Sequence, residues 1–155
     1  MRRPYQLLAL ALALVAGACL GDPAAPKIES TTFAPSLGVD LNASTRTTSG
    51  LYTRDLVIGT GATAVSGARL NVHYSGALPG GFVFDDNVAG GDTPFAFVLG
   101  SGAVIKGWDE GLVGMRVGGR RQLIIPARLG YGSTGSGAIP PNSILVFTVE
   151  LVSIG

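Results

Sequence analysis

Glycine occupies 24 of the 155 positions, and this abundance is the strongest limit on what the chain can fold into. Glycine weakens helices and favours turns, so the count predicts a turn-rich sheet rather than a helical bundle. Two segments, residues 69–78 and 143–154, show the period-two alternation of strands. The apolar positions on one face are Leu70, Val72 and Tyr74 in the first segment and Leu145, Phe147, Val149 and Leu151 in the second.

One stretch has helical spacing instead. Ile105, Trp108, Leu112 and Met115 are 3, 4 and 3 residues apart, which places them on one helix face. Glycines at 107 and 111 weaken this helix, so we expect it to be short and held by packing. Further strands are expected over residues 51–58, 82–85, 95–99 and 120–125. The sequence therefore predicts an α+β roll, a bent antiparallel β-sheet wrapped on one short α-helix, as a single domain over residues 50–155.

The N-terminus has the composition of an export signal. Arg2 and Arg3 precede an apolar run over residues 7–15, and the small residues Ala16-Gly17-Ala18 follow it. The apolar run is too short for a stable transmembrane helix. Residues 1–18 are therefore predicted to be a signal peptide.

Two cleavage products remain open. Ala16 and Ala18 suit the ordinary signal peptidase, and the same residues before Cys19 resemble a bacterial lipobox, although lipoboxes usually carry leucine where Ala16 stands. Cys19 is the one cysteine in the chain, and a free thiol is a liability in an oxidising compartment. We therefore favour acylation of Cys19, giving a membrane-anchored lipoprotein that faces the periplasm or cell surface. Leu20, next in the chain, resembles the sorting position of outer-membrane lipoproteins.

Residues 20–49 are rich in proline, serine, threonine and alanine and lack a sustained period. This composition predicts a flexible linker, so that residues 19–49 comprise the lipidated cysteine and a tether to the domain. The alternative is that Phe33, Leu37 and Val39 dock on the domain as an additional strand.

Charge and the rare residue types exclude several kinds of function. The formal charge is +1 for the whole chain and becomes −1 when Arg2 and Arg3 are removed with the signal. No basic stripe remains for phosphate contacts along a duplex, so nucleic acid is not an expected partner. The single cysteine excludes an internal disulfide, and a single histidine, His73, excludes the usual zinc clusters. No metal or other cofactor is expected.

Seven short blocks occur in order between residues 50 and 155. They are Val72-His73-Tyr74-Ser75-Gly76, Phe84-Asp85, Pro94-Phe95-Ala96-Phe97-Val98-Leu99-Gly100, Val104-Ile105-Lys106-Gly107-Trp108-Asp109-Glu110-Gly111, Gly130-Tyr131-Gly132, Ile139-Pro140-Pro141-Asn142 and Leu145-Val146-Phe147-Thr148-Val149-Glu150-Leu151. Together these blocks resemble the FKBP family of peptidyl-prolyl cis/trans isomerases and cover nearly all of the predicted domain. One block alone would be weak evidence, whereas seven in order are specific. The resemblance implies the FKBP roll and rotation of X-Pro peptide bonds.

The resemblance also implies roles for ten residues around one pocket. Trp108 would form the floor beneath the proline ring, and Asp85 would hydrogen-bond near the entrance. The Tyr131 hydroxyl and the Ile105 backbone N–H would hold substrate carbonyls. The remaining walls and rim would be Tyr74, Phe84, Phe95, Val104, Phe147 and Ile139. Asp85, Trp108, Tyr131 and Phe147 are assigned as catalytic on this basis, and the other six as substrate-binding.

The implied partners are proline-containing polypeptides, which an exported enzyme would help to fold, and rapamycin-like macrolides as inhibitors. A monomer is expected. Asp86-Asn87 departs from the two serines common in the family, and Ser136-Gly137-Ala138 replaces bulkier residues in a slightly shorter loop. These departures leave open a catalytically weak module that binds proline peptides or acts as a chaperone.

Structural roles could also explain several of these residues and their neighbours. Buried aromatics often form an ordinary core, and His73, on the face opposite Tyr74, is expected to be structural. Asp109 and Glu110 are expected to favour the helix N-terminus electrostatically rather than to form an acid–base pair.

Overall fold

The computed structural model describes residues 25–88 and 93–155. The predicted signal peptide and Cys19 lie outside these residues. The strands are β1 (Thr45–Arg46), β2 (Tyr52–Val57), β3 (Arg69–Ala77), β4 (Val83–Asp86), β5 (Phe95–Val98), β6 (Arg120–Ile125) and β7 (Leu145–Ile154). One α-helix, α1, spans Lys106–Gly111, and short 3-10 turns occupy η1 (Ile28–Ser30), η2 (Pro35–Leu37) and η3 (Ala127–Leu129). No helix among the described residues is long and apolar enough to cross a membrane.

All pairings in the sheet are antiparallel, in the order β1-β2-β6-β7-β3-β4. β3 pairs with β7 along one edge, and β4 and β5 share its other edge. Register shifts in the β2–β6, β3–β4 and β3–β7 pairs mark bulges, which increase the twist of a sheet. The predicted α+β roll is therefore confirmed, together with the strands predicted in the domain.

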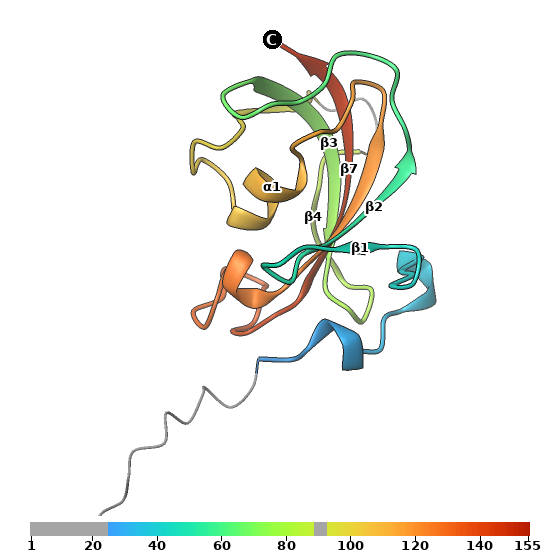
Figure 1. Cartoon of the computed structure of the whole chain (residues 1–155). Helices are drawn as coiled ribbons and strands as arrows, with labels where there is room; N and C mark the ends of the chain where they lie inside the picture. Colours follow the sequence, from blue (N-terminus) through green and yellow to red (C-terminus); the bar gives the residue numbers. More distant parts are fainter. Residues whose placement is uncertain (1–24, 89–92) are drawn as a thin grey trace, which may run out of the picture.

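Helix α1 packs against the inner face of the curved sheet (Figure 1). The main hydrophobic cluster lies between them and includes the fully buried Leu70, Leu112, Leu123 and Leu145. Two glycines allow the close approach: a Cβ at residue 107 would lie 2.6 Å from a side-chain atom of Ile125, and one at residue 111 would lie 2.7 Å from Leu123. The glycines that lower helix propensity thus bring the helix against β6.

The segment before β2 differs from the predicted flexible linker. Residues 28–41 pass along the outer face of the sheet, and the chain then returns through β1 to a turn beside α1, where the Ser49 hydroxyl contacts Glu110 (Figure 1). On the outer face Ile28 is buried with Tyr52, Ile124, Ile144 and Val146, and the flanking apolar side chains that pack on this second cluster are Phe33, Leu37, Val39 and Leu41. Burial of these groups offsets the entropy of ordering the segment. The folded unit therefore begins well before the boundary predicted at residue 50.

Polar contacts fix the same segment. The buried Gln122 side chain donates to the Leu37 carbonyl at 2.7 Å, and the Ala34 N–H donates to the Pro79 carbonyl at 2.8 Å. The docking is made by 3-10 turns around Phe33 and Leu37 rather than by the additional strand considered above. The one strand in this segment, β1, pairs with β2. All these contacts lie within residues 25–155, so a chain beginning at Leu20 retains both clusters and the whole sheet.

Candidate active site

A cavity of about 640 Å³ opens between α1, the sheet and the loop before β7; we call it the aromatic cavity. All ten residues that the sequence singled out line it. Four further lining residues were not assigned to the site: Ala103, Ser136, Gly137 and Ala138. Ser136, Gly137 and Ala138 lie in the loop between the blocks at residues 130–132 and 139–142, and this position in the sequence is what could have indicated them.

The indole of Trp108 lies at the centre of a group of aromatic rings. Its ring centroid is 5.1 Å from Tyr74, 5.3 Å from Phe147 and 6.3 Å from Phe95, all in edge-to-face arrangements. Phe97 supports the indole at 5.6 Å without lining the cavity. Trp108 is 4% exposed, and its buried indole N–H has no acceptor among the described residues. The ring therefore contributes shape and an apolar surface, not an internal hydrogen bond.

The loop before α1 is fixed by Asp109. Its carboxylate accepts the Gly100 N–H at 2.7 Å and the Gly102 N–H at 2.9 Å, which holds the turn leading to Val104 and Ile105. Asp109 also lies in the first turn of α1, where a negative charge was expected to be favourable. Glu110 accepts from the Ser49 hydroxyl at 2.6 Å. Ile105 directly precedes the helix, where backbone N–H groups have no intrahelical partner.

The opposite rim is a tight turn. Ser136 and Ile139 exchange backbone hydrogen bonds of 3.0 and 2.8 Å, so the small residues between them form a closed tip beside the cavity. Ile139 is buried, whereas Tyr131 is 38% exposed and lines the cavity from the segment after η3. This geometry leaves apolar walls with a few polar groups at the edge, as in small-molecule and peptide pockets.

The polar edge is built on Tyr74 and Asp85. The Tyr74 hydroxyl donates to the Asp85 carboxylate at 2.7 Å. Burial, and secondarily the bond to Asp85, raises the pKa of Tyr74. Burial and the bond to Glu29 likewise raise the pKa of Tyr52. Both tyrosines are therefore held as neutral donors.

These shifts predict the alkaline behaviour of the fold. An unfolded tyrosine titrates near pH 10, so the two raised pKa values contribute stability that is full below about pH 10 and is lost as pH rises through the folded values. A tyrosinate absorbance titration should show a late component above pH 10, which Tyr74→Phe reduces and Tyr52, also with a raised pKa, retains in part. Complete titration of all tyrosines near pH 10 in the folded chain would contradict this assignment.

Asn87 fills the gap between β4 and β5 on the edge of β3. Its side-chain oxygen accepts the Tyr74 N–H at 2.7 Å, its side-chain nitrogen donates to the Val72 carbonyl at 3.3 Å, and its own N–H donates to the Tyr74 carbonyl at 3.0 Å. Its carbonyl also lies 3.0 Å from His73 Nδ1. His73 is thus used structurally, and Asn87, one of the departures from the family pattern, holds the strand that carries Tyr74.

Replacing Asn87 is therefore expected to disturb the site indirectly. Asn87→Ala leaves the Tyr74 N–H without its acceptor and should lower the free energy of unfolding by about 1–3 kcal/mol. Asn87→Asp keeps the acceptor and should cost less. Denaturant unfolding of both variants checks this. Because Tyr74 lines the aromatic cavity, Asn87→Ala should also weaken ligand binding there, and Asn87→Asp should partly restore it. Equal free energies of unfolding for Asn87→Ala and Asn87→Asp would show that the hydrogen bond from the Tyr74 N–H to the side chain of residue 87 does not stabilise the fold.

Gly76 lies beneath two walls of the aromatic cavity. A Cβ at this position would lie 2.5 Å from the Phe147 ring and 2.8 Å from the Phe84 ring. Gly76→Ala should displace both rings, lower kcat/KM at least about tenfold and cost about 1–3 kcal/mol of stability. Gly80→Ala is the matched control, because nothing lies within 4 Å of the added methyl. A kcat/KM and a stability of Gly76→Ala close to those of the control would contradict the assignment of Phe84 and Phe147 as walls.

Comparison with known proteins agrees with this geometry. The family model for FKBP-type peptidyl-prolyl cis-trans isomerases matches residues 61–152. FK506-binding protein 3 of Candida albicans is 51% identical over 105 residues, which are 68% of this chain and 24% of that protein. A peptidyl-prolyl cis-trans isomerase of Saccharomyces cerevisiae is also 51% identical over 105 residues, which are 68% of this chain and 25% of that protein. The chain thus spans about a quarter of the length of the curated relatives it matches.

Solved structures give the same result. The crystal structure of AtFKBP13 is similar at a TM-score of 0.67 and 40% identity, covering 72% of this chain and 98% of that one. The crystal structure of FkpA from Escherichia coli is similar at 0.66 and 38% identity, covering 72% and 51%. Because the family model covers more than half of the chain, and the sequence blocks and the fold agree with it, the chain belongs to the FKBP-type peptidyl-prolyl cis-trans isomerase family.

Proposed function

We propose that this chain is a peptidyl-prolyl cis/trans isomerase that uses the aromatic cavity to rotate X-Pro bonds. The observation that carries the proposal is the placement of Trp108 at 4% exposure among Tyr74, Phe95 and Phe147, with all ten family-matched residues around one opening. The cavity has mainly apolar walls and, at about 640 Å³, is large enough for a prolyl ring and its neighbours.

The chemistry requires no nucleophile. Rotation breaks amide resonance against a barrier of about 18–20 kcal/mol. The planar amide is more polar than the twisted one, so water stabilises the ground state more than the transition state. Transfer to a dry aromatic site removes that advantage. In our proposal the Trp108 indole carries the prolyl ring, and Phe147 and the other rings exclude water.

Polar groups at the edge would hold the flanking peptide in a turn. We assign this role to the Tyr131 hydroxyl and the Ile105 N–H, with Asp85 acting at the entrance while it anchors the Tyr74 hydroxyl. Such binding is needed only to position the substrate. A reduction of the barrier by about 4 kcal/mol already gives roughly a thousandfold acceleration.

We further propose that the enzyme acts on exported polypeptides as a monomer anchored through acylated Cys19. The charged N-terminus, the apolar run and the small residues before the lone cysteine support export. Mass spectrometry of the N-terminus of the protein from its native membrane tests the anchor: a diacylglyceryl cysteine at position 19 is expected, and an unmodified N-terminus would reject it.

The isomerase activity is tested on a chain beginning at Leu20. It should accelerate cis-to-trans conversion of a proline tetrapeptide, and a rapamycin-like macrolide should block it, as the names of the FK506-binding relatives suggest. No acceleration at micromolar protein would reject the proposal. Binding of the peptide without acceleration, with Tyr131→Phe changing neither rate nor affinity, would favour a catalytically weak binding module.

A further inference from the structure

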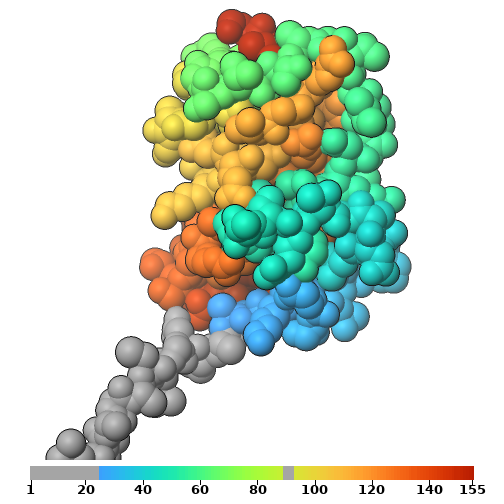
Figure 2. All heavy atoms as spheres, viewed as in Figure 1, coloured from blue at the N-terminus to red at the C-terminus, as the bar shows by residue number. Residues whose placement is uncertain are grey.

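A second cleft, of about 560 Å³, lies at the end of the molecule where the described chain begins (Figure 2). It lies between the first described residues, drawn in blue, and the orange segment that follows β6. Its charged side chains are Lys27, Glu29, Arg46 and Arg128, and the rest of its lining is Ala25, Pro26, Ile28, Gly50, Pro126 and Ala127. We call it the basic cleft.

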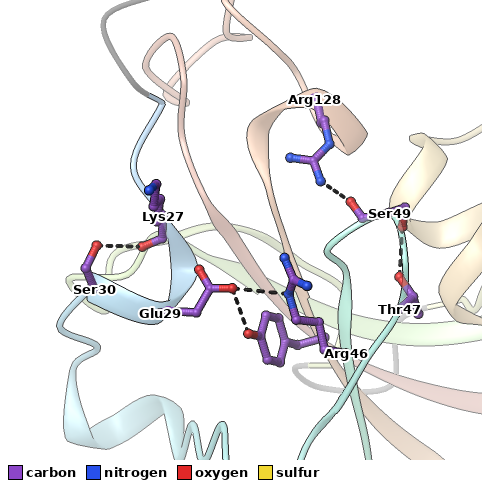
Figure 3. Close-up of polar contacts among 8 residues, drawn as sticks. Lys27, Glu29, Ser30, Arg46, Thr47, Ser49 and Arg128 are labelled. Carbon is purple, nitrogen blue, oxygen red and sulfur yellow. Dashed lines mark hydrogen bonds and ion pairs between the residues drawn. The ribbon is translucent and has the colours of Figure 1, made fainter. Parts of the chain in front are cut away.

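The cations of the basic cleft come from three separate segments that the fold brings together (Figure 3). Arg46, from β1, forms an ion pair of 3.1 Å with Glu29, whose carboxylate also accepts the Tyr52 hydroxyl at 2.9 Å. Arg128, from η3, donates to the carbonyl of Ser49. Lys27 precedes η1, and its carbonyl is held by the Thr31 hydroxyl at 2.7 Å. The side chains of Arg46 and Arg128 and the backbone of Lys27 are thus held by other segments of the fold.

The charge of the cleft is unbalanced. One carboxylate, Glu29, faces three cations, and among the described residues neither Lys27 nor Arg128 forms an ion pair. Hydrogen bonds from its own backbone and from Tyr52 lower the pKa of Glu29, so this carboxylate is ionised at neutral pH. A cleft with two excess positive charges favours an anion, and the planar guanidinium of Arg128 suits phosphate oxygens.

The position of the cleft indicates which anion is near. Ala25 lines the cleft, and Cys19 precedes it by six residues. At about 3.5 Å per residue, six residues span at most about 20 Å. An acyl chain on Cys19 would therefore hold the basic cleft within about 20 Å of the bilayer surface, where lipid headgroups carry phosphate.

We propose that the basic cleft binds the phosphate group of anionic membrane phospholipids. The inference rests on the anchoring at Cys19 proposed above. The anchor would keep the protein near the membrane surface, and the basic cleft would fix its orientation there. η3 and the residues after it contribute Arg128 to the basic cleft and Tyr131 to the aromatic cavity. Binding of the basic cleft to lipid headgroups would therefore hold the aromatic cavity in one orientation relative to the membrane.

Vesicle co-sedimentation of the unacylated chain beginning at Leu20 tests the cleft without the anchor. The chain should bind vesicles rich in phosphatidylglycerol but not phosphatidylcholine vesicles, and added salt should weaken the binding. Lys27→Gln and Arg128→Gln should each weaken it about fivefold, since one cation near an anionic surface contributes about that factor. Glu29→Gln should strengthen it. Arg69→Gln, at the far end of β3 beside Gly155, is the matched control and should bind as the unaltered chain does.

Each other result overturns the inference. Equal weakening by Arg69→Gln would mean that overall charge is responsible, and no binding to anionic vesicles would mean that the cleft does not hold lipid. Inorganic phosphate that shifts the amide signals of Lys27 and Arg128 while anionic vesicles fail to bind would identify a soluble phosphate ligand instead. Isomerisation is measured on the same samples: lost vesicle binding with intact isomerisation rejects this inference alone, and the reverse rejects the proposed function alone.

Discussion

A chain that begins at Gly50, where composition placed the domain boundary, is expected to be less stable than a chain that begins at Leu20 by about 5 kcal/mol or more. Residues 25–49 bury Ile28 and pack four further apolar side chains on the outer face of the sheet. Truncating one such buried side chain costs about 2–5 kcal/mol. Since whole domains are stable by about 5–15 kcal/mol, the shortened chain should be close to unfolding at room temperature.

Denaturant unfolding of three chains measures this effect. A chain beginning at Ala25 is the matched control, because it keeps every contact described for the segment and should unfold with the chain beginning at Leu20. Ile28→Ala should fall between the control and the shortest chain. If the chain beginning at Gly50 were as stable as the longest one, the docking of residues 25–49 would contribute nothing and the segment would be a tether after all.

The largest expected effect on catalysis is that of Trp108→Ala, which should lower kcat/KM by at least about 100-fold. The indole supplies the surface on which the prolyl ring would lie, and its loss would admit water to the cavity. A hundredfold loss corresponds to about 2.7 kcal/mol of transition-state stabilisation. Trp108→Phe retains an aromatic floor and should lose less.

Stability must be separated from catalysis in this experiment. Truncating a buried tryptophan also costs about 3–5 kcal/mol of folding free energy. Leu112→Ala is the matched control, since Leu112 is fully buried beside α1 but does not line the aromatic cavity. With the folded fraction of each sample measured, Leu112→Ala should keep its kcat/KM. A similar loss in both variants, or full activity in Trp108→Ala, would count against the proposed floor.

The strands and the helix could be predicted because their side-chain periods follow directly from the face they bury. Alternation in β3 and β7 assigned Leu70, Val72 and Val149 to the inner face, where all three are fully buried. The helix was correctly placed around Trp108, although α1 ends at Gly111 rather than continuing to Met115. The spacing of apolar residues is sufficient to predict a strand or helix when one face of that element packs against a single neighbouring layer.

The sequence analysis missed the docking of residues 25–49. A composition rich in proline and polar residues predicts a flexible segment, but it does not show whether the few apolar side chains find a surface of the domain on which to pack. A signal was present in the sheet itself. Leu123-Ile124-Ile125 in β6 and Leu145-Val146-Phe147 in β7 are continuous apolar runs, which indicate strands covered on both faces. Ile124 and Val146 point to the outer cluster, and their partners had to come from elsewhere in the chain.

Ten of the fourteen residues that line the aromatic cavity came from family motifs, whereas the groups that hold them in place did not. Asn87 acts because β4 and β5 leave a gap beside Tyr74, and Asp109 acts because Gly100 and Gly102 donate their N–H groups to its carboxylate. The basic cleft joins residues about 100 positions apart, so overall charge gave no indication of it. Such contacts depend on tertiary register, which short-range patterns do not report.

In the proposed mechanism a prolyl ring lies on the indole of Trp108 inside the aromatic cavity. NMR of a proline tetrapeptide bound to the chain beginning at Leu20 tests it most directly. We predict upfield ring-current shifts of the prolyl protons and nuclear Overhauser contacts from them to Trp108 and Phe147. Prolyl contacts confined to exposed apolar residues such as Phe82 and Val83, with the Trp108 signals unchanged, would contradict the account.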